Sequence, residues 1–407
     1  MKKNSKYIVL LGDGMSDFPI AELGNKTPLE YAKTPNMDYL AQNGIMGLAK
    51  TVPDGMPPGS DTANLSIFGY NPEKYYSGRA PLEAINMGIN LNKDDVAFRC
   101  NIVNIENSIM KDFSGNHVET ELSKIIIEEL NKNISIENIE FFPGVSYRNI
   151  IVWRNYPYFN ITETVPPHDI QDKKTSDYNP IGDGSDILNS LIKKSTEIIT
   201  SSRKIQEAKL KFKGLPSSIW IWGGGKKPEI DTLNKRFGLN GYTISAVDLI
   251  HGIGRAAGLS PLHVNGATGY IDTNYHGKAD ALLKEIKNVN YIYLHVESPD
   301  ESGHEGNLEH KLKSIEDFDK HIVGRVIEGM KKYSDYTLLL MPDHPTPISL
   351  KTHTDDPVPF CLFKSTGIPE KYKDKHTDTY NENSASSTGL YIDKGYKLIE
   401  FMINGKI

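Results

Sequence analysis

The sequence has little cysteine and no long apolar run. Two cysteines, Cys100 and Cys361, occur among the 407 residues, and each stands in an apolar stretch. Buried, reduced thiols explain this pattern better than a disulfide or a pair of metal ligands. No segment approaches the roughly 20 consecutive apolar residues of a membrane-spanning helix. The sequence therefore predicts a protein without disulfides and without a membrane as its partner.

The chain also lacks an excess of basic residues. It has 46 lysines and arginines against 52 aspartates and glutamates, a formal charge of -6, which argues against nucleic acid as a partner. Lys2, Lys3 and Lys6 precede a short apolar run that imitates a signal peptide. The run stops at Gly12, however, and no small-residue cleavage site follows. We therefore expect a cytoplasmic protein.

A P-loop is missing as well. Residues 223–225 are three glycines followed by Lys226, at the end of a predicted strand over 218–222, but the motif GxxxxGK[ST] occurs nowhere in the chain. We expect no cradle for a nucleoside triphosphate. Lys226 stays a candidate for contact with an anion.

Strand-like and helix-like segments alternate along most of the chain. Helices are predicted over 248–257 and 309–330, and short apolar runs typical of buried strands are Lys6–Leu11, Ser218–Trp222, Asn290–Val296, Tyr336–Met341 and Val358–Phe363. Such alternation indicates an α/β fold with a doubly wound, mostly parallel sheet.

The pattern changes between residues 103 and 213. Strands are expected over 105–112 and 147–153, with an amphipathic helix over 119–130 between them. A long connecting helix is expected over 186–209. We therefore predict a smaller α+β domain, 103–213, inserted into a core domain made of 1–102 and 214–407.

Ser60 follows a Pro57-Pro58-Gly59 elbow and precedes an apolar run, a pattern typical of a tight turn that opens a helix. Two interpretations stay open from these residues alone. The serine could cap the helix, as serine often does. Alternatively, unpaired N–H groups at the helix start could hold an anion on the serine oxygen.

Acidic and imidazole side chains follow several of the predicted strands. Any one of these clusters could be a hydrogen-bonded turn, but parallel strands would bring them to one edge of a sheet. Mixed carboxylate and imidazole ligands suit Mn²⁺ or Zn²⁺ better than Mg²⁺. Two such cations could clamp a phosphoryl group and activate a serine. The residues concerned are Asp13, Ser60, Asp300, His304, Asp343, His344 and His353.

Arg79 and Arg99 are further candidates for binding an anion. Arg79 stands in a loop of turn residues, and Arg99 lies in the segment Ala97–Asn101. For both, a structural ion pair is an equally good explanation.

The motifs taken together resemble those of the archaeal-type, 2,3-bisphosphoglycerate-independent phosphoglycerate mutases of the alkaline phosphatase superfamily. The resemblance spans essentially the whole chain and is strongest in 11–15, 58–65, 78–84, 265–270, 295–304 and 343–344 with 352–354. It implies an alkaline-phosphatase-like fold with an inserted cap domain that closes over the substrate.

The resemblance also implies a mechanism. Ser60 is similar to a nucleophile that takes the phosphoryl group of 3-phosphoglycerate and returns it to give 2-phosphoglycerate, a step of glycolysis, without added 2,3-bisphosphoglycerate. Asp13, Ser60, Asp343 and His344 are similar to the ligands of one metal. Those of the other are Asp300, His304 and His353. Candidate contacts to the small phosphorylated substrate are Arg79, Arg99, Arg148, His168, Asp169 and Lys226.

Other activities fit the same metal core. One branch of the family has been proposed to be homoserine kinases, and a metal-dependent phosphatase would need only water as acceptor. A silent binding protein is disfavoured because every expected ligand is intact. The sequence does not specify an oligomeric state.

Overall fold

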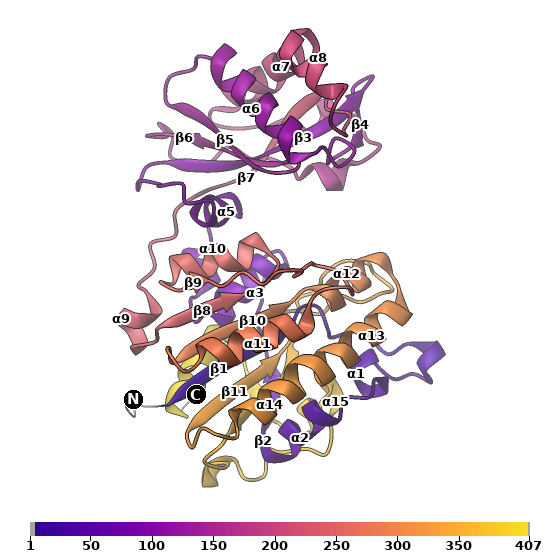
Figure 1. Ribbon diagram of the computed structural model, residues 1–407, viewed down its shortest axis with the longest axis vertical. Helices are drawn as coiled ribbons and strands as arrows, with labels where there is room; N and C mark the ends of the chain where they lie inside the picture. Colours follow the sequence, from indigo (N-terminus) through magenta and orange to yellow (C-terminus); the bar gives the residue numbers. More distant parts are fainter. Residues whose placement is uncertain (1–4, 406–407) are drawn as a thin grey trace. The chain divides into compact units, whose positions relative to one another are not determined.

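The computed structural model describes residues 5–405 and divides the chain into two compact units (Figure 1). The first unit comprises Met1–Tyr76 and Ile230–Ile407, and the second comprises Ser77–Glu229. No helix among the described residues has both the length and the apolar character needed to cross a membrane.

The first unit is built on an eight-stranded sheet in the order β13-β2-β12-β11-β1-β10-β8-β9. Strands β11, β1, β10, β8 and β9 run parallel, as does the pair β13 and β2, whereas β12 is antiparallel to both of its neighbours. The mostly parallel α/β sheet predicted from the sequence is therefore confirmed. The strand bounds are β1 Lys6–Gly12, β2 Gly44–Ala49, β8 Gly241–Ile244, β9 Ser260–Pro261, β10 Tyr291–Val296, β11 Tyr336–Met341, β12 Val358–Lys364 and β13 Tyr391–Ile392.

Helices cover this sheet, and α11, α13 and α14 lie along one face of it (Figure 1). Their buried residues, including Leu282 and Phe318, join strand residues such as Leu10 and Leu294 in one apolar core. The longer helices of the unit are α2 Pro35–Asn43, α3 Ser60–Ile67, α10 Asp248–Ala256, α11 Tyr275–Glu285, α12 Ser298–Glu305, α13 Leu308–Phe318, α14 Gly324–Met330, α15 Glu382–Ser387 and α16 Leu398–Asn404. Shorter ones are α1 Pro28–Tyr31, α4 Pro72–Tyr75 and α9 Leu233–Phe237, and a π-helical turn, Asp319–Val323, joins α13 to α14.

The second unit has a five-stranded antiparallel sheet centred on β3, which pairs with β4, β6 and β7. Helix α6 packs on β5 and α7 on β7, around a separate apolar core. The bounds are α5 Ala80–Asn86, β3 Val96–Glu106, β4 Ile109–Asp112, α6 Thr120–Asn133, β5 Ile139–Val145, β6 Arg148–Trp153, α7 Ser185–Ser201, α8 Arg203–Lys209 and β7 Ser218–Lys226.

The second unit is wider than the 103–213 insertion predicted from the sequence. Contacts assign residues 77–102 and 214–229 to it as well. The reason is non-local pairing: most of β3 precedes residue 103 and all of β7 follows residue 213, yet the two strands pair from Val96–Lys226 to Val103–Ser218.

Four local predictions need correction. The segment 105–112 is a hairpin rather than a strand, because Asn107 and Ser108 adopt positive φ between β3 and β4. The expected helix over 186–209 is two helices, interrupted at Ser202, whose side chain caps α8. Both helices pack in the apolar core of the second unit rather than connecting domains. The glycines 223–225 belong to strand β7. Asp300 and His304, which the intervening Gly303 predicts to lie in a turn, instead lie on a helix, α12.

Candidate metal centre

Three neighbouring parallel strands place the acidic and imidazole clusters side by side. Strand β1 lies between β10 and β11, with Gly12 beside Val296 and Leu11 beside Met341. The strands thus end at the same level, and the segments that follow them carry Asp13, Asp300 with His304, and Asp343 with His344. The acidic and imidazole side chains therefore meet at the carboxyl edge of one sheet, where the sequence places them.

One half of the cluster consists of Asp300, His304 and His353. Asp300 and His304 stand one helical turn apart on α12, so that their side chains share a face. His304 Nε2 lies 3.2 Å from Asp300 Oδ2, and His353 Nε2 lies 3.6 Å from Asp300 Oδ1. The two Nε2 atoms are 2.9 Å apart. Such close imidazole nitrogens require a proton or a cation between them.

The partner of the other His304 nitrogen supports a cation there. His304 Nδ1 lies 3.0 Å from the backbone oxygen of Lys351, which can only accept, so Nδ1 carries a proton. In the neutral imidazole the lone pair is then on Nε2, facing Asp300. Fixing the tautomer in this way is typical of metal-binding histidines.

The other half consists of Asp13, Ser60, Asp343 and His344, and its two carboxylates and the imidazole are fully buried. His344 Nε2 lies 3.5 Å from Asp13 Oδ1 and 3.5 Å from Asp343 Oδ2. Asp343 is held by the N–H groups of Gly14 and His344 and by the side-chain amide of Asn64. These bonds fix its orientation.

Ser60 belongs to this half. Gly59 occupies the N-cap position of α3, and Ser60 is its first residue. The Ser60 Oγ lies 3.2 Å from His344 Nε2 and 3.5 Å from Asp13 Oδ2. Ser60 therefore does not cap the helix, and its hydroxyl faces the ligand cluster; that it holds an anion there stays a prediction.

Electrostatics differ between the halves. Burial raises the pKa of Asp13 well above its ordinary range, and the nearby charges of Asp343, Glu297 and Asp300 raise it further. Burial would also raise the pKa of Asp300, but the hydrogen bonds and charges of His304 and His353 bring it well below the ordinary range. Although burial lowers the pKa of His304, the same carboxylate raises it to about 9.

The residues fit divalent cations. Asp13 Oδ1 is buried and accepts no hydrogen bond from any residue that the structure describes. A buried carboxylate oxygen without a donor is costly unless a cation approaches it. Three groups place oxygen and nitrogen atoms within 4.8 Å of one another, namely Asp300, His304 and His353; Asp13, Asp300 and His344; and Asp13, His295 and Asp343.

Two residues beside the cluster were not singled out by sequence reasoning. His295 is fully buried, with its Nε2 2.9 Å from Asp13 Oδ2. Glu297 lies close by, and burial, followed by repulsion from Asp300, raises its pKa to about 8. In the sequence, the only signal for these two residues was an imidazole and a carboxylate at the end of an otherwise apolar strand.

The predicted substrate contacts lie in the second unit. Arg79 Nε is 2.8 Å from Glu83 Oε1, and Arg99 Nε is 2.9 Å from Glu83 Oε2. The Arg99 guanidinium also lies 4.3 Å from the centre of the Trp222 ring. Both arginines therefore form the structural ion pairs that the sequence left open, around one buried carboxylate.

The remaining candidates lie in the same unit, and one of them, His168, contacts the Trp222 ring that Arg99 also covers. The His168 ring lies 5.4 Å from Trp222, edge to face, and its Nε2 is 3.7 Å from Asp169 Oδ1. Arg148 begins β6 and covers the Tyr147 ring, and Lys226 ends β7. Their role as substrate contacts stays a prediction.

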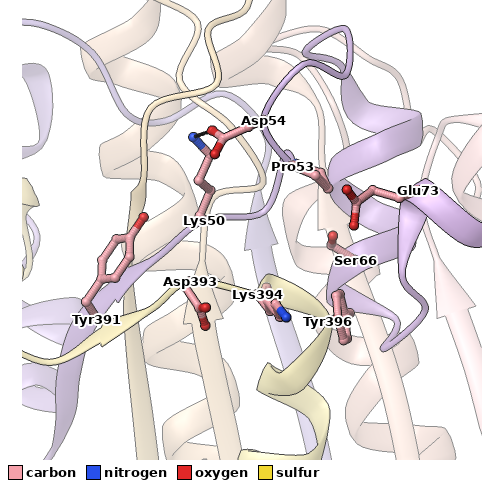
Figure 2. Close-up of a pocket in the computed structure, with 10 residues that line it drawn as sticks. Lys50, Pro53, Asp54, Ser66, Glu73, Tyr391, Asp393, Lys394 and Tyr396 are labelled. Carbon is pink, nitrogen blue, oxygen red and sulfur yellow. Dashed lines mark hydrogen bonds and ion pairs between the residues drawn. The ribbon is translucent and has the colours of Figure 1, made fainter.

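A cavity of about 310 Å³ lies elsewhere in the first unit (Figure 2). It is lined by Lys50, Asp54, Ser66, Glu73, Tyr391, Lys394 and neighbours, and none of the predicted ligands reaches it. Figure 2 shows Lys50 turned toward Asp54, and the two form an ion pair within the segment that leads from β2 to Ser60.

Comparison with known proteins gives one consistent result. The sequence pattern described as 2,3-bisphosphoglycerate-independent phosphoglycerate mutase matches residues 41–203. A protein of Geobacter sulfurreducens named probable 2,3-bisphosphoglycerate-independent phosphoglycerate mutase is 49% identical over 407 residues, covering 98% of this chain and 100% of the relative. The 2,3-bisphosphoglycerate-independent phosphoglycerate mutase of Methanosarcina barkeri is 46% identical over 409 residues, with 98% and 100% covered.

Solved structures agree on the fold. A protein from Pyrococcus horikoshii superposes with a TM-score of 0.81 at 28% identity, covering 98% of this chain and 97% of that one. The cofactor-independent phosphoglycerate mutase from Thermoplasma acidophilum superposes with a TM-score of 0.62 at 21% identity, covering 98% and 99%. With relatives of this identity over nearly its full length, the chain belongs to the family of 2,3-bisphosphoglycerate-independent phosphoglycerate mutases.

Proposed function

We propose that this protein interconverts 3-phosphoglycerate and 2-phosphoglycerate through a phosphoserine at Ser60, next to two divalent cations. The names of its close relatives support the reaction. The observation that carries the mechanism is the position of the Ser60 hydroxyl, within 3.5 Å of both His344 and Asp13 at the start of a helix.

Seven side chains would hold the cations. Asp300, His304 and His353 would bind one, and Asp13, Ser60, Asp343 and His344 the other. When bound, the cations neutralise phosphoryl oxygens and lower the pKa of the serine hydroxyl. Manganese suits this mixture of carboxylate and imidazole, and zinc or magnesium are the alternatives. The choice of metal, like a cytoplasmic location, stays a prediction from the sequence.

The chain's own groups determine where Ser60 points. Its backbone oxygen accepts a hydrogen bond from Asn64 Nδ2, 2.8 Å away, and the same amide donates to Asp343 Oδ2 at 2.7 Å. Asn64 is in turn held by the Tyr293 hydroxyl. The first turn of α3 is thereby tied to the carboxylate that follows β11, and the serine oxygen keeps its position during transfer.

Transfer then needs no second phosphorylated compound. The Ser60 hydroxyl loses its proton as its oxygen forms a bond to phosphorus, the bond to the 3-oxygen of glycerate breaks, and the 3-oxygen takes up a proton. The 2-hydroxyl of the same glycerate then loses its proton and attacks the phosphoserine, and the released Ser60 oxygen takes up a proton to restore the hydroxyl. Because the substrate supplies the phosphoryl group and the same glycerate receives it back, added 2,3-bisphosphoglycerate is unnecessary.

An enolase-coupled assay tests the proposal. With Mn²⁺ and 3-phosphoglycerate, and without bisphosphoglycerate, the wild-type protein should produce 2-phosphoglycerate. Consumption of ATP that depends on homoserine would instead identify a kinase. Release of inorganic phosphate alone would identify a phosphatase, and either result without mutase turnover would refute the proposal.

A further inference from the structure

His295 connects the buried carboxylate Asp13 to a serine that directly follows the neighbouring strand, β8. It is the fifth residue of β10, and the parallel register places Leu294 beside Ile244, the last residue of β8. Ser245, directly after β8, therefore lies beside His295. The His295 Nδ1 is 3.1 Å from Ser245 Oγ, and its Nε2 is 2.9 Å from Asp13 Oδ2. All three residues are buried.

The contacts of Ser245 fix which imidazole nitrogen carries the proton. Ser245 Oγ accepts a hydrogen bond from the N–H of Val247 at 2.9 Å. The serine's own proton then goes to His295 Nδ1, so Nδ1 is an acceptor. In a neutral imidazole the proton is consequently on Nε2. This N–H points at Asp13 Oδ2 rather than at Glu297 Oε2, which is farther away at 3.6 Å.

The hydrogen bond makes the two oxygens of Asp13 different. Oδ2 is occupied by the N–H of His295. Oδ1 accepts no hydrogen bond from the described part of the chain and lies 3.5 Å from His344 Nε2. The imidazole therefore determines which carboxylate oxygen stays available to a cation.

We infer that His295, oriented by Ser245, is a positioning residue that holds Asp13 for cation binding. The inference rests on the metal centre of the proposed function and extends it to two residues outside the predicted ligand set. The competing assignment is His295 as a ligand itself, since Asp13, His295 and Asp343 offer atoms within 4.8 Å of one another.

The Ser245 contacts argue against His295 as a ligand. A ligating Nε2 would need the proton on Nδ1, so the N–H groups of His295 and Val247 would both point at Ser245 Oγ. The serine proton would then have no acceptor among the hydrogen bonds found in the described residues. An unsatisfied buried hydroxyl is costly, and the donor assignment avoids that cost.

Manganese binding to chelator-stripped protein tests the inference. The variants are His295→Ala, His295→Gln and Ser245→Ala, with affinity measured by calorimetry and metal per chain by mass spectrometry. His295→Ala should weaken one class of Mn²⁺ sites about 10–100-fold without lowering the number bound at saturation. His295→Gln, whose amide can still donate a hydrogen bond, should recover most of the Mn²⁺ affinity. The affinity of Ser245→Ala should lie between that of His295→Ala and that of the wild type.

A second buried histidine gives a matched control. His251 Nε2 contacts the backbone oxygen of Ser245, not its hydroxyl, at 3.1 Å. His251→Gln should bind Mn²⁺ like the wild type. Thermal unfolding of each stripped variant checks the fold, and Ser245→Ala, the mildest change, keeps the test decisive if His295→Ala fails to fold.

Three results would overturn the inference. Affinities of the His295 and Ser245 variants within twofold of wild type would remove the positioning role. Loss of one bound Mn²⁺ per chain in both His295 variants would make His295 a ligand. Equal weakening in His251→Gln would make the effect one of general packing.

Mutase turnover is measured separately from metal binding, with the enolase-coupled assay. Wild-type protein that binds Mn²⁺ but does not turn over phosphoglycerate would refute the proposed function and leave this inference standing, whereas wild-type protein that binds no Mn²⁺ would refute both.

Discussion

The two halves of the metal centre balance charge in different ways. Asp300 is paired with two imidazoles whose side chains are 34% and 22% exposed, and its carboxylate raises the pKa of one of them, His304, to about 9. Asp13 and Asp343 are fully buried, beside His344 and His295, and burial lowers the pKa of both imidazoles. The first half can be stable without metal, whereas the second half buries two carboxylates whose mutual repulsion is relieved by a proton on Asp13 or by a cation.

The largest expected effect concerns Ser60, in the buried half. Ser60→Ala removes the nucleophile and should lower mutase turnover by on the order of 10³-fold or more, because no other group can accept the phosphoryl group. The enolase-coupled assay measures this loss. The unfolding temperature should stay close to wild type. Substantial remaining turnover would contradict the phosphoserine scheme.

A second prediction concerns a ligand of the half that can be stable without metal. His353→Ala should lower Mn²⁺ affinity by at least about 10-fold and should lower turnover in parallel, because a nitrogen ligand is lost. Calorimetry and the coupled assay, run on the same preparation, check both. A loss of turnover with unchanged metal affinity would show that His353 is not a ligand.

Two matched substitutions in metal-stripped protein test the difference in charge balance between the two halves most sharply. Asp300→Asn removes the partner of two imidazoles and should lower the free energy of unfolding by about 1.5–3 kcal/mol. Asp13→Asn removes a buried carboxyl group whose ionised form is disfavoured by burial and by the nearby Asp343, and should raise the free energy of unfolding by about 1–3 kcal/mol. Urea unfolding with chelator present measures both.

The surface pair of Lys50 and Asp54 supplies a control for these unfolding experiments. Asp54→Ala should change the free energy of unfolding by less than about 1 kcal/mol, because the Asp54 side chain is 89% exposed and ion pairs of exposed groups contribute little. If Asp13→Asn and Asp300→Asn change the free energy of unfolding with the same sign, the two halves do not differ in how they balance charge.

The smallest expected effect is a pH dependence of stripped protein. Because the pKa of His304 is raised from 6.5 to about 9, its contribution to stability is complete below pH 6.5 and is lost as the pH rises through 9. The free energy of unfolding of wild type should therefore fall over this interval. In His304→Gln the fall should be shallower, and identical profiles would refute the proposed Asp300–His304 pair.

Much of the centre could be predicted from the sequence because its residues follow strand ends. Asp13, Asp343 and His344 come directly after apolar runs, and parallel strands align such ends whatever their distance along the chain. His295 escaped notice because one imidazole in an apolar strand is more often structural. Its contact with Ser245 depends on the register of β8 and β10, which no local pattern encodes.

The second unit was harder to delimit for a related reason. Its central strand, β3, pairs with β7 more than a hundred residues later, and antiparallel pairing of this range leaves no local trace. Likewise, the ion pairs of Arg79 and Arg99 both depend on Glu83, a residue that the sequence did not distinguish from its neighbours.

The central claim is that Asp13, Asp300 and their neighbours hold paired cations against the Ser60 hydroxyl. The most direct test measures mutase turnover and bound metal together while Mn²⁺ is added back to stripped protein. Turnover should be absent at first and should return as the second Mn²⁺ per chain binds. Full turnover in the stripped protein, or none after two Mn²⁺ have bound, would contradict the account.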